Sequence, residues 1–218
     1  IGNYFFPDFL LTADPINSKN PSLSLIQSGL ISNSSIDSYI TQALNQSVFK
    51  ILRVSIPDGY FSFFWDNHSV IPAFRFNIIT VISSIFLFSD DSLNPVIPSV
   101  FIFVYAVLVR LFVPLVFGGV FNSGDILLAL FSSGTLFCGI FLLQWFSTVP
   151  YTLCGKIIYA FLAGVMAFLI TGCGTSPVGM VFTILASNIL SVLIKVVENK
   201  RYYINLRKIF PPNSKGSY

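Results

Sequence analysis

Hydrophobic residues gather into five long runs that are separated by short polar stretches. The runs are Val70–Phe88, Val96–Gly118, Ile126–Phe146, Ile157–Gly172 and Val178–Val197. Each is close to the roughly 20 residues that an α-helix needs to cross a hydrocarbon core of about 30 Å. Because a bilayer interior holds no water to satisfy backbone amides, runs of this kind are expected to be helical. The pattern predicts an all-α, polytopic membrane helical bundle with five transmembrane helices.

Residues 13–69 contain no apolar stretch that could cross a membrane. Residues 1–69 are therefore predicted to form a segment outside the membrane. Ser, Asn, Pro and Gly are dense up to Ser35. From Ile36 to Ser55, apolar residues recur at helical spacing with polar residues between them, which predicts an amphipathic helix. Two placements stay open for this helix, on the membrane surface or packed beneath a larger domain. Residues 56–69 are expected to form a loop with aromatic residues near the headgroups.

Composition supports a membrane location, and charge indicates an orientation. Hydrophobic residues make up 54% of the chain and charged residues 10%, against about 25% charged in soluble domains. The net charge of +3 is too small to indicate nucleic-acid binding. Half of the 12 basic residues lie at or beyond the end of the last run: Lys195, Lys200, Arg201, Arg207, Lys208 and Lys215. Because Lys and Arg near span ends favour the cytoplasmic side, residues 198–218 are predicted to be a basic cytoplasmic tail. The transmembrane region is then 70–197, and residues 1–69 are extracytoplasmic.

Three charged residues fall in or beside the runs, where a charge usually has a function or a partner. Arg75 lies near the start of its run, so its side chain is expected to reach the interface. Arg110 is deeper, and two readings stay open: a functional or internally partnered charge, or a helix that ends nearby at Pro114. Asp125 directly precedes an apolar run and is predicted to be an N-cap.

Motifs of catalysis and metal binding are not found. His68 is the single histidine, and no Cys or carboxylate cluster lies near it at ligand spacing, so a structural role is favoured. The three cysteines, Cys138, Cys154 and Cys173, are odd in number and widely spaced. They indicate neither a disulfide framework nor a metal site. No catalytic residue and no metal ligand are therefore predicted.

The end of the chain resembles the last two helices of the NqrB/RnfD family. The segments that carry the resemblance are 155–165, GKIIYAFLAGV, and 177–188, PVGMVFTILASN. In that family a Gly-Lys or Gly-Arg step opens the penultimate helix, and a Pro-Glu-Gly step opens the last, which contains an Asn. Gly155–Lys156 and Asn188 match these features here, while Val178 replaces the Glu.

The same family carries an extracytoplasmic Asp followed by Ser-Gly-Ala-Thr and often Pro, and its Thr holds FMN through a phosphoester. Asp14 and Pro21 match the two outer positions, and Asn20 occupies the Thr position. An amide cannot form the phosphoester, because the bond needs a hydroxyl oxygen. Ser18 and Ser22 are hydroxyls nearby but out of register. The resemblance implies FMN as a cofactor, with covalent attachment not expected at this degenerate flavin-anchor region.

Two further departures accompany the resemblance. A family Thr-Asp-Pro signature would fall on residues 144–146, which read Gln-Trp-Phe. Family members have about twice as many spans, and the chain begins at Ile1 without an initiator Met. We therefore expect a divergent member that begins inside a larger protein.

The resemblance implies a membrane subunit of an Rnf- or Nqr-type ion-translocating electron-transport complex in a bacterial inner membrane. Other membrane subunits of the complex would be its partners, and the chain would be a scaffold with a degenerate flavin site. A different class of function stays open, that of a permease-like or membrane-assembly protein without redox activity. Arg110 and Asn188 would then line a path or a helix interface.

Overall fold

The computed structural model describes residues 35–52, 60–65, 71–116, 121, 124–132, 134–144, 149–173 and 178–209. The helices are α5 (Ser35–Leu52), α6 (Tyr60–Trp65), α7 (Pro72–Arg75), α8 (Asn77–Ser89), α9 (Val96–Val116), α10 (Ile126–Ser132), α11 (Thr135–Ile140), the 3₁₀ turn η1 (Leu142–Gln144), α12 (Leu153–Ala167), the π-helical turn η2 (Phe168–Gly172) and α13 (Gly179–Ile209). Over these residues the chain contains helices and turns and no strand. The predicted all-α class is confirmed for this part of the chain.

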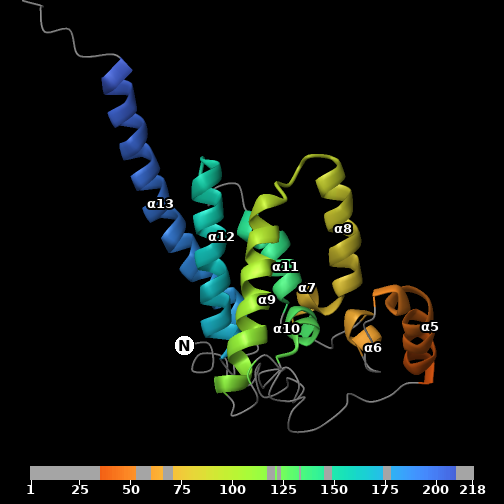
Figure 1. Ribbon diagram of the computed structural model, residues 1–218. Helices are drawn as coiled ribbons and strands as arrows, with labels where there is room; N and C mark the ends of the chain where they lie inside the picture. The colour runs from red at the N-terminus through yellow and green to blue at the C-terminus, as the bar shows by residue number, and fades with distance from the viewer. Residues whose placement is uncertain are drawn as a thin grey trace, which may run out of the picture.

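α8, α9 and α12 run nearly parallel, and the long α13 slants across them (Figure 1). Three segments are long and apolar enough to cross a membrane: Val96–Val113, Leu153–Gly172 and Gly179–Lys208. The helices Asn77–Ser89 and Thr135–Gln144 are apolar but shorter. The protein is therefore a multi-pass membrane protein with three helices of spanning length among the described residues.

Two of the predicted runs are interrupted. The first breaks at Phe76, whose φ of −106° and ψ of 90° are extended and separate α7 from α8. The third breaks at Gly134, which adopts a φ of 67°. A Cβ at Gly134 would lie 2.3 Å from Cγ of Phe74, so tertiary packing at this point requires glycine. Hydropathy alone predicted continuous helices here and was wrong, because it does not record such packing.

The last two runs are longer than predicted. The predicted fourth helix begins at Ile157, but α12 begins at Leu153 because the Thr152 side chain accepts a hydrogen bond from the Gly155 N–H. The predicted fifth helix ends at Val197, whereas α13 continues to Ile209 without a break. Polar and basic residues therefore extend the last helix instead of ending it.

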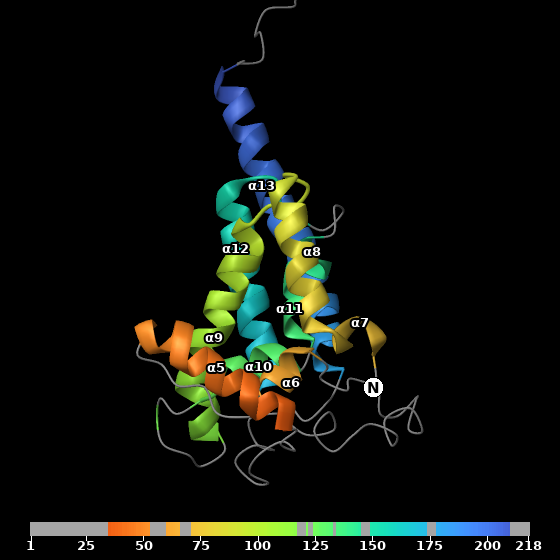
Figure 2. The ribbon, with the colours of Figure 1, turned by 90° about the vertical axis from the view of Figure 1, so that its right-hand side faces the viewer.

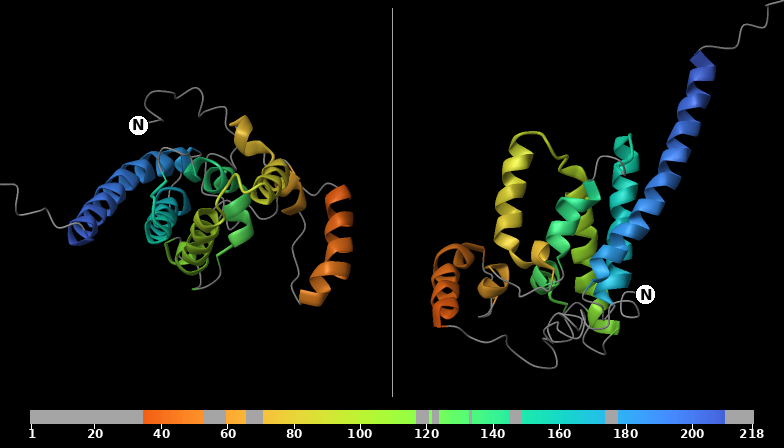
Figure 3. Two further views of the ribbon diagram at one scale, coloured as in Figure 1. Left: turned by 90° about the horizontal axis from the view of Figure 1, so that it is seen from above. Right: turned by 180° about the vertical axis from the view of Figure 1, so that it is seen from behind.

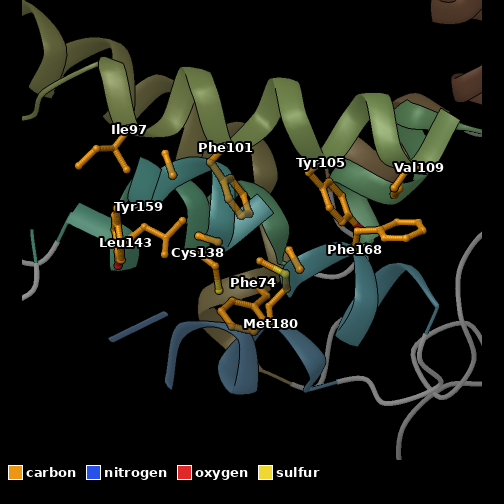
Figure 4. Packing of buried hydrophobic residues seen from close by; sticks show 14 of the residues in the cluster. Phe74, Ile97, Phe101, Tyr105, Val109, Cys138, Leu143, Tyr159, Phe168 and Met180 are labelled. Carbon is orange, nitrogen blue, oxygen red and sulfur yellow. The ribbon is translucent and has the colours of Figure 1, made fainter. Parts of the chain in front are cut away.

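One face of α9 supplies the large side chains of the core. Ile97, Phe101, Tyr105 and Val109 follow one another at intervals of four, and all are buried. They face small residues of α12, and a Cβ on Gly164 would lie 2.9 Å from Cγ1 of Val104. Figure 4 shows these side chains converging between the helices. In a bilayer, close approach of this kind supplies the van der Waals contact that holds helices together.

A helix, α5, lies where the sequence predicts an amphipathic one, with slightly different ends; its place on a membrane surface stays a prediction. It lies to the side of one end of the bundle and runs crosswise to the long helices (Figure 2). It contacts α6, which in turn contacts α8 and α10. The C-terminal end of α13 projects beyond the bundle at the opposite end (Figure 3). α5 and the end of α13 thus lie at opposite ends of the described molecule.

Candidate functional site

The interior face of α13 carries a row of hydroxyl groups. Thr183, Ser187 and Ser191 are four residues apart, so they lie on one face, and all three are buried. We call these three residues the hydroxyl seam. α13 packs against α12, η2, α11 and η1, so the hydroxyl seam faces the centre of the bundle. Polar residues within a membrane bundle usually lie on an inward face of this kind.

Hydrogen bonds within α13 set the chemistry of the hydroxyl seam. Thr183 Oγ1 donates to the Gly179 carbonyl at 3.1 Å, and Ser187 Oγ donates to the Thr183 carbonyl at 2.7 Å. Each of these two hydroxyls uses its proton on its own helix. What it offers to any other group is therefore the lone pairs of its oxygen.

Neighbouring elements add neutral polar groups that are also buried. Thr135 of α11 donates to the Ala129 carbonyl at 3.2 Å. Gln144 of η1 donates from Nε2 to the Ile140 carbonyl at 2.9 Å. Thr171 of η2 lies against the start of α13, since a Cβ on Gly179 would be 2.9 Å from its Oγ1. The centre of the bundle is therefore a neutral region that contains many oxygen atoms.

Asn188 lies beside the hydroxyl seam and has an unsatisfied acceptor. Its Oδ1 atom is buried and has no hydrogen-bond partner among the described residues. A buried acceptor left unpaired costs about 1–3 kcal/mol, so such atoms usually bind water or an ion. Asn188 is also one of the positions at which the sequence resembles the NqrB/RnfD family. The structure thus places this residue where it can contribute an oxygen to a polar path.

The groups around the hydroxyl seam restrict its chemistry. The described residues contain no group of three His, Cys, Asp or Glu side chains that could hold a metal ion. Hydroxyl and amide oxygens can accept hydrogen bonds from water, or coordinate a hard cation. The arrangement is suited to passing or holding a small polar species.

A charged cluster closes one end of the bundle. Arg110 donates from Nη1 to the Gly124 carbonyl at 2.9 Å, and the Gly124 N–H donates back to the Arg110 carbonyl at 3.3 Å. The Arg110 carbonyl is available because Pro114, four residues on, has no N–H to donate to it. Of the two readings for Arg110, the internal partner is confirmed. The helix does not end at Pro114, since α9 continues to Val116.

Asp125 joins the same cluster and is the predicted N-cap. Its Oδ1 accepts from the Leu128 N–H at 3.1 Å, and the Tyr60 hydroxyl donates to its Oδ2. Burial raises the pKa of Asp125, and the backbone N–H groups of Leu128 and Leu127 partly offset this. The residue therefore ties α6 to the start of α10 as well as capping its own helix.

A second charged cluster lies at the other end, where Glu198 of α13 meets the start of α12. Its carboxylate accepts from the Tyr151 N–H at 2.9 Å and the Thr152 N–H at 3.1 Å. The Thr152 hydroxyl donates to it at 2.5 Å. A Cβ on Gly155 would lie 1.9 Å from Glu198 Oε1, so the Gly of the Gly-Lys step makes room for this carboxylate. Lys195 lies over the Tyr151 ring, 5.4 Å from its centroid.

The remaining sequence predictions have different outcomes. Arg75 is exposed at the end of α7, 5.4 Å from the Phe76 ring centroid, which fits a side chain that reaches the interface. His68 lies outside the described residues, as do all four residues of the flavin-anchor region, Asp14, Ser18, Asn20 and Ser22. The predicted flavin site therefore remains a prediction.

Sequence reasoning missed Glu198 and the hydroxyl seam. The signal for the hydroxyl seam was present, because Thr183, Ser187 and Ser191 recur every four residues within an apolar run. Glu198 offered no such signal, since its partners lie 46 and 47 residues earlier.

Comparison with protein-family models gives a match over most of the chain. A model of the NQR2, RnfD, RnfE family matches residues 8–203 of the 218-residue chain. No curated protein sequence matches it. The matched range includes α5 to α12, most of α13 and the flavin-anchor region.

Proposed function

The chain belongs to the NQR2, RnfD, RnfE family, and from this premise we propose that it is a membrane subunit of an Rnf- or Nqr-type ion-translocating electron-transport complex. The observation that carries the proposal is the family match over residues 8–203. The helical, multi-pass architecture and the polar interior of the bundle support it. Its partners are the other membrane subunits of that complex.

Within the complex, the proposed role is that of a scaffold with a degenerate flavin site. The family position for the phosphoester is occupied here by Asn20. An amide has no hydroxyl oxygen, so this residue does not fit covalent attachment of FMN. Ser18 and Ser22 are the hydroxyls closest to it in sequence on either side. FMN, if the chain holds it, would be held by non-covalent contacts in the region of Asp14.

The proposed topology has five crossings of a bacterial inner membrane. α8 and the segment from α10 to η1 would cross together with the three helices of spanning length. The basic end of α13 lies at the opposite end of the bundle from α5 (Figure 1), which supports a cytoplasmic C-terminus and an extracytoplasmic N-terminal segment. α5 would then lie on the outer membrane surface.

Flavin attachment and partner binding test this proposal. The chain is expressed with the other membrane subunits and with the enzyme that attaches the flavin, and denaturing gels are inspected under ultraviolet light. We expect co-purification with those subunits, no fluorescent band for the natural sequence, and a fluorescent band for Asn20→Thr. Asn17→Thr is the matched control and should stay dark. If the natural chain fluoresces, separate replacement of Ser18 and Ser22 identifies an off-register hydroxyl, and the degenerate-site proposal fails.

The hydroxyl seam and Asn188 favour one alternative, a permease-like protein without redox activity. Arg110 does not contribute to that path, because Gly124 holds it at the end of the bundle. A protein that co-purifies with none of the subunits and moves a solute across vesicle membranes would support the permease and overturn the subunit assignment.

A further inference from the structure

The projecting end of α13 has a surface unlike the rest of the molecule. α13 is 31 residues long, or about 46 Å at about 1.5 Å per residue. Its apolar part, Gly179–Val197, is about 28 Å long and matches a hydrocarbon core of about 30 Å. Residues 198–209 therefore begin at the level of the lipid headgroups.

Beyond Glu198, every charged residue of this end is basic. Glu198 is the last acidic residue of the chain, and its carboxylate is engaged by Tyr151 and Thr152 of the neighbouring segment. Beyond it, Lys200, Arg201, Arg207 and Lys208 are all exposed. The outward charge of this end is thus entirely positive.

Aromatic residues lie between the basic ones. Tyr202 and Tyr203 are 62% and 65% exposed, although both are large and partly apolar. Tyrosines of this kind concentrate where a bilayer meets water, because the ring prefers the interface and the hydroxyl stays hydrated. On one face of the helix, an open groove is lined by Val196, Asn199, Lys200, Tyr203, Ile204 and Arg207. Lys200 and Arg207 are therefore on the same face as Tyr203.

We propose that residues 198–209 form a binding surface for anionic phospholipid headgroups in the leaflet around α13. The occupant follows from the position and chemistry of the face. It is continuous with a helix of spanning length, Lys200 and Arg201 lie within about 6 Å of its apolar part along the axis, at headgroup level, and Val196 can contact the upper acyl chains. Lys and Arg donate to phosphate oxygens, and each basic residue near an anionic membrane contributes about fivefold in affinity. This inference needs α13 to cross the membrane and does not depend on a redox role.

Lipid retention by the full chain tests the proposal. The protein is purified in mild detergent with equal amounts of phosphatidylglycerol and phosphatidylcholine, and bound lipids are counted by native mass spectrometry. We expect preferential retention of phosphatidylglycerol. Replacement of Lys200, Arg201, Arg207 and Lys208 by Gln should reduce that preference by about tenfold or more. The charge-keeping pair Lys200→Arg and Lys208→Arg should retain it, and so should Arg75→Gln at the opposite end.

A second measurement places the surface in the bilayer. A spin label at Tyr203→Cys, in a background with Cys154 and Cys173 replaced by Ser, is compared in vesicles of phosphatidylcholine with and without phosphatidylglycerol. The label should be shielded from a polar relaxation agent when the anionic lipid is present, and less so when Lys200 and Arg207 are Gln. Equal accessibility in both vesicles would overturn the proposal. Unchanged lipid retention in the fourfold Gln variant would also overturn the proposal. If that variant kept its lipid but lost an acidic partner subunit, the surface would bind protein and not lipid.

Discussion

At each end of the bundle, a carboxylate near a helix start accepts hydrogen bonds from backbone N–H groups, but the two carboxylates come from different places in the chain. At one end, Asp125 caps α10, which begins directly after it, and also receives the Tyr60 hydroxyl. At the other end, Glu198 accepts the N–H groups that precede α12, although it belongs to α13. Asp125 satisfies a backbone N–H that a helix start leaves without a partner, and Glu198 satisfies those of the two residues just before a helix start. At the Asp125 end the cap is local and the Tyr60 contact holds α6, whereas the Glu198 end joins two long helices.

The two ends also differ in how far they are buried. The Asp125 end is partly buried and includes a backbone-to-backbone approach, so changes there disturb close packing. The Glu198 end is more exposed, and water can replace part of what a substitution removes. We therefore expect larger effects at the Asp125 end.

The largest effect is expected for Gly124→Ala. A Cβ at this position would lie 2.2 Å from the Val109 carbonyl oxygen, and backbone atoms cannot move aside as a side chain can. We expect a loss of about 3 kcal/mol in the free energy of unfolding, measured by titration with SDS in mixed micelles. Gln42→Ala on the exposed face of α5 is the control and should change it by less than about 0.5 kcal/mol. A Gly124→Ala protein of natural stability would mean that this close approach does not exist.

The next largest effect is expected for Asp125→Ala, which removes both the N-cap and the acceptor for Tyr60. We expect a loss of about 2 kcal/mol by the same titration. Asp125→Asn is the matched variant, because an amide oxygen still caps a helix, and its loss should be smaller. Combining Asp125→Ala with Tyr60→Phe should cost less than the sum of the two single changes. Full additivity would contradict a direct hydrogen bond between the two side chains.

Whether the sequence predicts the role of each carboxylate depends on how far along the chain its hydrogen-bond partners lie. The Asp125 cap was predictable, because its partner is three residues away and the pattern of an Asp before an apolar run is local. Glu198 was not, since only the packing of α12 on α13 brings the two segments together. The same reason explains the left-handed Gly134, where a Cβ would meet Phe74 of a distant segment. Hydropathy predicts that apolar segments are helical, but it does not report where they bend.

The candidate site also contains one residue that the sequence identified and a set of residues that it did not. Asn188 was identified by resemblance to a family, and the structure adds that its Oδ1 is buried. The hydroxyl seam could have been found by its spacing of four residues, but Ser and Thr in apolar runs are common and neutral. Only the packing of α13 shows that these hydroxyls face the interior.

A smaller effect is expected for Glu198→Ala. The change removes the acceptor for the Tyr151 and Thr152 N–H groups, and we expect a loss of about 1 kcal/mol. Glu198→Gln keeps an acceptor oxygen and should lose less. Asn199→Ala, next to it on the exposed side, is the control. If Glu198→Ala matched Asp125→Ala in cost, the contrast between a tightly packed end and an exposed end would not hold.

The smallest effect is the dependence of stability on pH at the Asp125 end. Burial raises the pKa of Asp125, so the folded protein keeps this proton to a higher pH than the unfolded chain does. The stabilisation from the neutral carboxyl is fully present below the unfolded pKa of about 4, and it is lost as pH rises through the folded pKa. Free energies of unfolding measured upward from about pH 4 should therefore fall more for the natural protein than for Asp125→Asn, which does not titrate. Parallel curves for the two proteins would show that Asp125 is ionised as readily in the folded state as in the unfolded chain, and the Asp125 end would then resemble the Glu198 end in its exposure to water.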